Sequence, residues 1–126
     1  ANVLEKLAID EERGKEIARE GAIRLLIALL VQETQPSVRM AVAATLRNLA
    51  TDDDNKREIA QEGGIQPLVG LLGEESDPSM REVAADALVK LAMDPENQKE
   101  IVLQGGMKPM LAYMGCSRVF AAFGKD

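Results

Sequence analysis

Few side chains in this 126-residue sequence could act in catalysis. Cys116 is the single cysteine, and the chain contains no histidine. A cysteine nucleophile needs a neighbouring base and a group that orients that base, and histidine is the usual choice. The absence of histidine also removes most zinc sites. We therefore predict that the protein is not an enzyme and that it has no catalytic residue, cofactor or metal site.

Two turn motifs carry residue types that bind ions in other proteins. Asp52, Asp53 and Asp54 are consecutive acids, but the ligand spacing and the closing glutamate of an EF-hand calcium loop are missing. The glycine pairs at 63–64 and 105–106 follow predicted helices instead of strands, and no Gly-Lys-Ser/Thr sequence follows them. We interpret the aspartates as a helix start and the glycines as helix terminators.

A third group of side chains favours binding over catalysis. A long helix is predicted at 36–50, with its core stripe on Val38, Val42, Leu46 and Leu49, and a second one is predicted at 78–93. The outward positions of these two helices are Ser37, Met40, Ala44, Arg47, Asn48, Glu82, Asp86 and Lys90. Cations form one row of this face and acids form another. It is the predicted groove for a segment of a partner protein.

These helices belong to a repeat of 42 residues. Leu4, Leu46 and Leu88 are evenly spaced (46 − 4 = 42 and 88 − 46 = 42). The same shift relates Leu7, Leu49 and Leu91, then Asp10, Asp52 and Asp94, then Ile17, Ile59 and Ile101, then Gly21, Gly63 and Gly105. The period lies within the roughly 40–47 residues of HEAT and armadillo arrays. An all-α repeat array is therefore predicted.

The repeat divides the chain into units of three helices. We expect a single domain, part of a longer array, with a partial repeat at 1–10, repeats at 11–52 and 53–94, and a partial repeat at 95–126. The predicted helices are 12–20, 22–32 and 36–50 in one repeat, 54–62, 65–72 and 78–93 in the next, and 95–104 and 107–114 in the last. Helix 22–32 is apolar on almost every side, so we expect it to be buried. The repetition fails after Gly115, where a short helix at 118–123 would cover the open end with Phe120 and Phe123.

The unit resembles the armadillo repeat. The resemblance rests on residues 43–50 and 63–69, and on Asn55, Ile59, Asn97 and Ile101. It implies a right-handed α-solenoid, an alpha-alpha superhelix of three-helix repeats, whose third helices line a concave groove for an extended peptide.

The resemblance also implies residue roles along that groove. In the family, an asparagine near the end of each third helix clamps the peptide backbone, often with a tryptophan one turn earlier. Asn48 matches the asparagine column, which otherwise holds Lys6 and Lys90, and the tryptophan column holds Asn2, Ala44 and Asp86. This departure argues against an importin-type grip on a basic nuclear-localisation peptide. Arg39 and Arg81 share a column at the edge of the core stripe, where we expect them to be structural.

The overall charge limits the classes of partner. The net charge of −6 disfavours nucleic acid and anionic lipid as direct partners. No apolar run reaches the 18–20 residues of a membrane span, so membrane insertion is not expected. The absence of a visible signal peptide leads us to expect a cytoplasmic location, with the nucleus as a second one.

The predicted function is therefore a protein–protein interaction scaffold or adaptor that binds an extended peptide segment. The alternative is self-association, in which the open repeat ends form a homodimer. The apolar residues expected to support it are Met107, Met110, Met114, Phe120 and Phe123.

Overall fold

The computed structural model describes residues 21–32, 35–73 and 76–124, and all regular structure within these ranges is helical. The helices are α3 (Ala22–Gln32), α4 (Pro36–Leu49), α5 (Asp53–Gln61), α6 (Ile65–Gly70), α7 (Pro78–Leu91), α8 (Pro95–Leu103), α9 (Met107–Met114) and α10 (Cys116–Phe123). They confirm the helices predicted between residues 22 and 114. The partial repeat predicted at 1–10 and the helix predicted at 12–20 lie outside the described residues.

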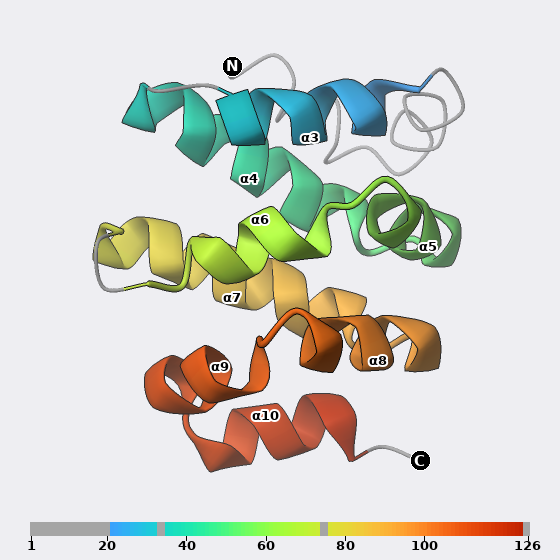
Figure 1. Ribbon diagram of the computed structural model, residues 1–126, viewed down its shortest axis with the longest axis vertical. Coiled ribbons are helices and arrows are strands. Elements are labelled where there is room, and N and C mark those ends of the chain that lie inside the picture. The colour runs from blue at the N-terminus through green and yellow to red at the C-terminus, as the bar shows by residue number, and fades with distance from the viewer. Residues whose placement is uncertain (1–20, 33–34, 74–75, 125–126) are drawn as a thin grey trace.

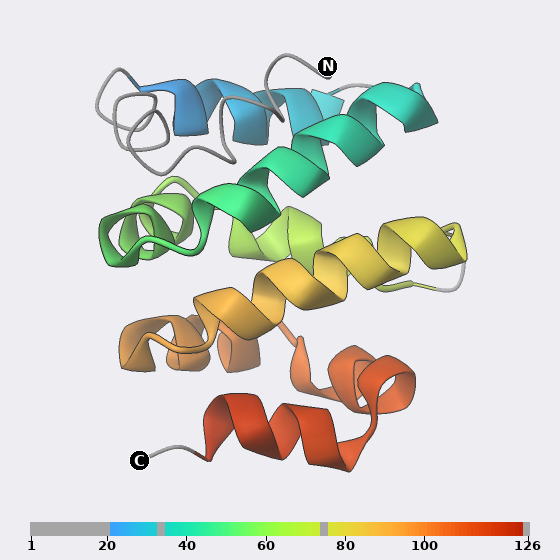
Figure 2. The same cartoon turned by 180° about the vertical axis from the view of Figure 1, so that it is seen from behind.

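The helices are stacked in layers along one axis. Figure 1 shows α3, α6 and α9, the second helices of successive units, on one face, with α5 and α8 to one side. The opposite view in Figure 2 shows α4, α7 and α10 one below the other, all running in the same direction. The chain is an α-solenoid, as predicted.

The core lies between these layers and is built largely from the third helices. Met80, Ala84, Leu88 and Leu91 are buried in α7, and each lies 42 residues after a member of the core stripe predicted for helix 36–50. The corresponding stripe of α4 is buried at Val42, Leu46 and Leu49, whereas Val38 in its first turn is half-buried. Of the described helix pairs, α4 and α7 have the most extensive contact.

The turns between units are stabilised by the residues that repeat. The Asp94 carboxylate accepts hydrogen bonds from the backbone N–H groups of Glu96 and Asn97 at 2.8 and 3.3 Å, and Asp52 caps α5 in the same way. This confirms that Asp52 begins a helix. Gly105 has a φ of +76°, and a Cβ on Gly106 would lie 2.7 Å from Cγ2 of Ile101. One glycine therefore allows the turn and the next allows close packing.

Two expectations about burial were met only in part. In α3, Leu29 is 39% exposed and Leu25 and Val31 are more exposed still, so this helix buries one side only. The last helix begins at Cys116, two residues before the predicted start, and buries Val119 and Ala122 against the core. Phe120 is 67% exposed and does not cover the open end, because it lies on the opposite side of α10 from these residues. Phe123, the other residue expected there, is half-buried and packs against the core.

Candidate protein-binding groove

The third helices α4, α7 and α10 form one face of the solenoid (Figure 2). This face carries the predicted groove positions. Ser37 and Glu82 are exposed. The half-buried positions are Met40, Arg47, Asn48, Asp86 and Lys90. These seven side chains therefore reach the surface along α4 and α7.

Ala44 was predicted to lie on the groove surface but is buried, with 3% of its surface exposed. Ala43, Ala84 and Ala87 are also fully buried. Small side chains allow helices to approach closely, and α4 and α7 have the most extensive contact of the described pairs. This close approach removes Ala44 from the surface. Asp86, which occupies the equivalent column in α7, remains accessible.

Cations gather at the C-terminal ends of α4 and α7. Burial lowers the pKa of the Lys90 amine, and the positive charge of Arg47 lowers it further, while Asp86 acts in the opposite direction. Arg47 directs its Nε to the side-chain oxygen of Asn48 at 3.4 Å. Lys56 also contributes to the field at Lys90, but its own charge is paired with Asp53 at 3.0 Å. Arg47 and Lys90 form no salt bridge within the described part of the chain, so an anion would be stabilised between them.

The acidic row of the same face has partners from the C-terminal helices. The Tyr113 hydroxyl donates to Oε1 of Glu82 at 2.8 Å. Arg118 donates to Oδ1 of Asp86 at 3.0 Å, and both side chains are partly exposed. Hydrogen bonding to Glu82 raises the pKa of Tyr113 above its ordinary value. Among the described residues, Asp86 is therefore paired with a cation, whereas Arg47 and Lys90 form no salt bridge.

Sequence reasoning missed Tyr113 and Arg118. Arg118 lies beyond Gly115, where the 42-residue register fails. Tyr113 lies within the register, 42 residues after Leu71, but the apolar residue in that column gives no signal for a hydroxyl contact. A register argument would have placed Arg118 outside the third helix. The structure instead begins α10 at Cys116, directly after Gly115, and this start brings Arg118 to α7.

The described residues show neither a metal site nor a membrane span. No cluster of three or more His, Cys, Asp or Glu side chains in these ranges could hold a metal ion. No described helix combines the length and the apolar character needed to cross a membrane. The single thiol, Cys116, is exposed at the start of α10.

Similar solved structures support the fold. An engineered protein of the Northeast Structural Genomics Consortium is 29% identical, with a TM-score of 0.80 over 96% of this chain and 50% of its own. A computationally designed armadillo repeat protein for modular peptide recognition is 21% identical, with a TM-score of 0.80 over 86% of this chain and 46% of its own. A designed armadillo repeat protein in complex with the peptide (KR)4 is 20% identical, with a TM-score of 0.80 over 97% of this chain and 52% of its own. The chain spans about half the length of these structures.

The comparison with curated proteins gave no match. The family model described as Armadillo/beta-catenin-like repeat matches residues 15–51 and 52–93, more than half of the chain. The observed order of short helix, glycine break, second helix and long third helix agrees with this match. The chain therefore belongs to the armadillo/beta-catenin-like repeat family.

Proposed function

We propose that the protein is a binding scaffold and that the face of α4, α7 and α10 holds an extended segment of a partner protein. The main observation behind this proposal is the pair of cations, Arg47 and Lys90, which lie in the last turns of α4 and α7 and form no salt bridge in the described part of the chain. An acidic side chain of the partner would supply the missing counter-charge. Asn48, beside Arg47, supplies an amide that can bond to the partner's backbone.

Two of the designed structures support a peptide as the kind of ligand. One is described as made for modular peptide recognition, and another is bound to (KR)4. The present chain differs from a receptor for a basic peptide because the groove cations Arg47 and Lys90 have no salt-bridge partner among the described residues. Its acidic residues Glu82 and Asp86 already contact Tyr113 and Arg118. Electrostatic complementarity therefore favours an acidic segment.

A displayed library of random peptides tests the proposal. The wild-type protein should select peptides with an acidic residue at a fixed position, and Arg47→Ala/Lys90→Ala should lose them. The matched control Arg57→Ala/Lys99→Ala removes two exposed cations from α5 and α8 and should keep them. Equal recovery of the selected peptides by the groove variant and the wild type would refute the groove assignment.

Self-association is a second candidate, which the exposed apolar residues of the C-terminal half favour. Leu103 and Phe120 are 78% and 67% exposed, whereas Met110, one of the residues expected at an open end, is fully buried. We expect a dimer formed in this way to dissociate in the variant Leu103→Ser/Phe120→Ser. Light scattering across a concentration series measures this, and a wild-type monomer at the highest concentration would remove the candidate.

A further inference from the structure

Two surface pockets of the solenoid are related by the 42-residue repeat. The α3–α6 pocket is lined by Leu30, Val31, Arg39, Gln66, Pro67, Gly70 and Leu71. The α6–α9 pocket is lined by Leu72, Gly73, Arg81, Lys108, Pro109, Ala112 and Tyr113. Adding 42 to each number of the first set gives the second set without exception. The volumes are also similar, about 450 and 430 Å³. The fold therefore forms equivalent pockets in two neighbouring repeats.

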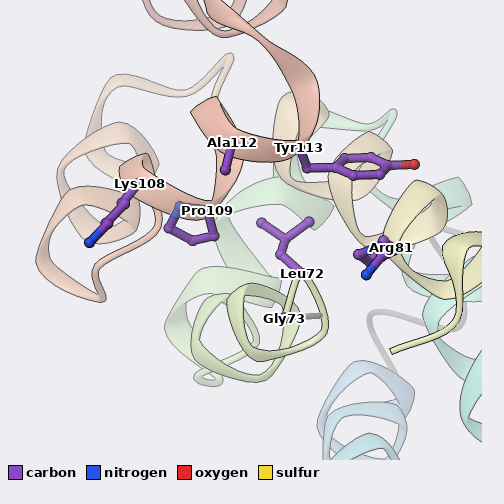
Figure 3. A pocket seen from close by; sticks show the side chains of 7 residues that line it. All are labelled: Leu72, Gly73, Arg81, Lys108, Pro109, Ala112 and Tyr113. Atoms are coloured by element: carbon purple, nitrogen blue, oxygen red, sulfur yellow. The ribbon is translucent and has the colours of Figure 1, made fainter. Parts of the chain in front are cut away.

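Each pocket combines apolar walls with one guanidinium. Figure 3 shows Leu72 and Pro109 between Lys108 on one side and Arg81 on the other. The Arg81 guanidinium lies 5.8 Å from the centre of the Tyr113 ring, which holds it by a cation–π contact. In the other pocket the Nε of Arg39 is buried and has no hydrogen-bond acceptor among the described residues. The expected structural role of Arg39, with its guanidinium bonded to a carboxylate or carbonyl, is therefore not met at Nε.

These pockets are separate from the groove. Arg39 lies in the first turn of α4, eight residues before Arg47, and this separates the two positions by about 12 Å along the helix axis. The walls of the pockets come from the second-helix layer, α3, α6 and α9, which the groove does not use. Asp77 lines a third pocket, which also borders Arg39. No salt bridge joins Asp77 to Arg39 in the described part of the chain.

We propose that the two pockets form a second docking surface, which binds successive acidic side chains of one extended partner segment. Charge complementarity selects the occupant: a glutamate offers an aliphatic stem to the apolar walls and a carboxylate to the guanidinium. The tighter site should be the α6–α9 pocket, because Lys108 replaces Gln66 there.

The repeat fixes the spacing of the acids in that segment. Packed helices lie about 8–10 Å apart, so equivalent pockets of neighbouring layers are separated by roughly this distance. A polyproline II segment advances about 9 Å in three residues and returns to the same face. The partner should therefore carry acidic residues three positions apart.

The test uses a peptide in which two glutamates are separated by two prolines. Isothermal titration calorimetry measures its affinity, and the fluorescence of Tyr113 reports on the α6–α9 pocket because the chain has no other tyrosine and no tryptophan. Replacing both glutamates by glutamine, or shortening the spacer to one proline, should weaken binding at least tenfold. Arg39→Gln and Arg81→Gln should each weaken it about tenfold, since each removes one charge-assisted hydrogen bond.

Matched variants separate an effect on the pockets from an effect on folding. Gln66→Lys gives the α3–α6 pocket the cation of its counterpart and should strengthen binding about twofold to threefold. A folding defect would weaken binding, so it cannot mimic this gain in affinity. The control variant Arg57→Ala/Lys99→Ala, which removes two exposed cations outside both pockets, should bind this peptide as the wild type does. The proposal would be overturned if the wild type bound the glutamine peptide as tightly as the glutamate peptide. It would also be overturned if a folded Arg39→Gln/Arg81→Gln protein bound the glutamate peptide as tightly as the wild type does.

Discussion

The hydroxyl of Tyr113 donates a hydrogen bond to Oε1 of Glu82 at 2.8 Å and so joins the end of α9 to the exposed side of α7. A second bond between the same parts of the molecule runs from Arg118 in α10 to Asp86, one helical turn after Glu82. Both acids were predicted to face a partner. Within the chain they also hold the C-terminal helices against the third-helix face, whereas Arg47 and Lys90 form no salt bridge among the described residues.

Tyr113 provides the pH dependence that tests this contact. The hydrogen bond to Glu82 is the main cause that raises the pKa of Tyr113 above its ordinary value near 10, with burial and the charge of Glu82 as further causes. The neutral hydroxyl is the donor, so the stabilisation is fully present below about pH 10 and is lost as pH rises through the raised pKa. Since the chain has one tyrosine, its tyrosinate absorbance titrates this residue alone.

The variant Glu82→Gln should move this titration to lower pH, because the uncharged amide opposes tyrosine ionisation less than a carboxylate does. Glu96→Gln is the matched control, since Glu96 lies on α8 next to Lys99. A titration of Tyr113 that is the same in all three proteins would contradict the assigned bond.

The sequence predicts those parts of the fold that repeat. Leu46 and Leu88 occupy the same column, and both are fully buried because the same helices surround them in each unit. Ala44 was misplaced because a helical wheel gives the direction of a side chain but not the distance to the neighbouring helix. Its small side chain lies at the contact with α7, the most extensive of the described helix contacts. Arg118 was missed because α10 begins outside the repeat register.

The N-cap of α8 should make a measurable contribution to stability. Asp94→Ala removes the two hydrogen bonds to the backbone N–H groups of Glu96 and Asn97, and should lower the free energy of unfolding by about 1 kcal/mol. Asp77→Ala is a matched control, because Asp77 occupies the N-cap of α7 without a side-chain capping bond. Its effect should be a few tenths of a kcal/mol. Urea unfolding followed by circular dichroism compares the two, and equal losses would show that the capping bonds do not stabilise α8.

Glycine at position 106 is required by packing. A Cβ there would lie 2.7 Å from Cγ2 of Ile101 and 3.0 Å from its carbonyl oxygen, so Gly106→Ala should destabilise the protein by about 1–3 kcal/mol. Gly70 ends α6, and a Cβ on it would have no atom within 4 Å. Gly70→Ala should therefore be neutral, or stabilising by up to about 1 kcal/mol. Thermal unfolding of the two variants gives the comparison, and a stable Gly106→Ala protein would mean that the turn can widen at low cost.

The last helix should respond locally to mutation of its buried side. Val119 is fully buried, and truncation to alanine removes about two methyl groups from the core, each worth roughly 0.8 kcal/mol. Because α10 packs mainly on α9 and α7, and repeat arrays are stabilised by contacts between neighbours, this loss should open α10 without opening α4. Hydrogen exchange should therefore accelerate about tenfold or more at the amides of α10 and remain nearly unchanged in α4. Phe120→Ala changes a residue that is 67% exposed and should leave both rates as they are. Faster exchange in Phe120→Ala but not in Val119→Ala would contradict this prediction. It would mean that α10 packs on the array through Phe120 and is rotated about its axis relative to the arrangement described.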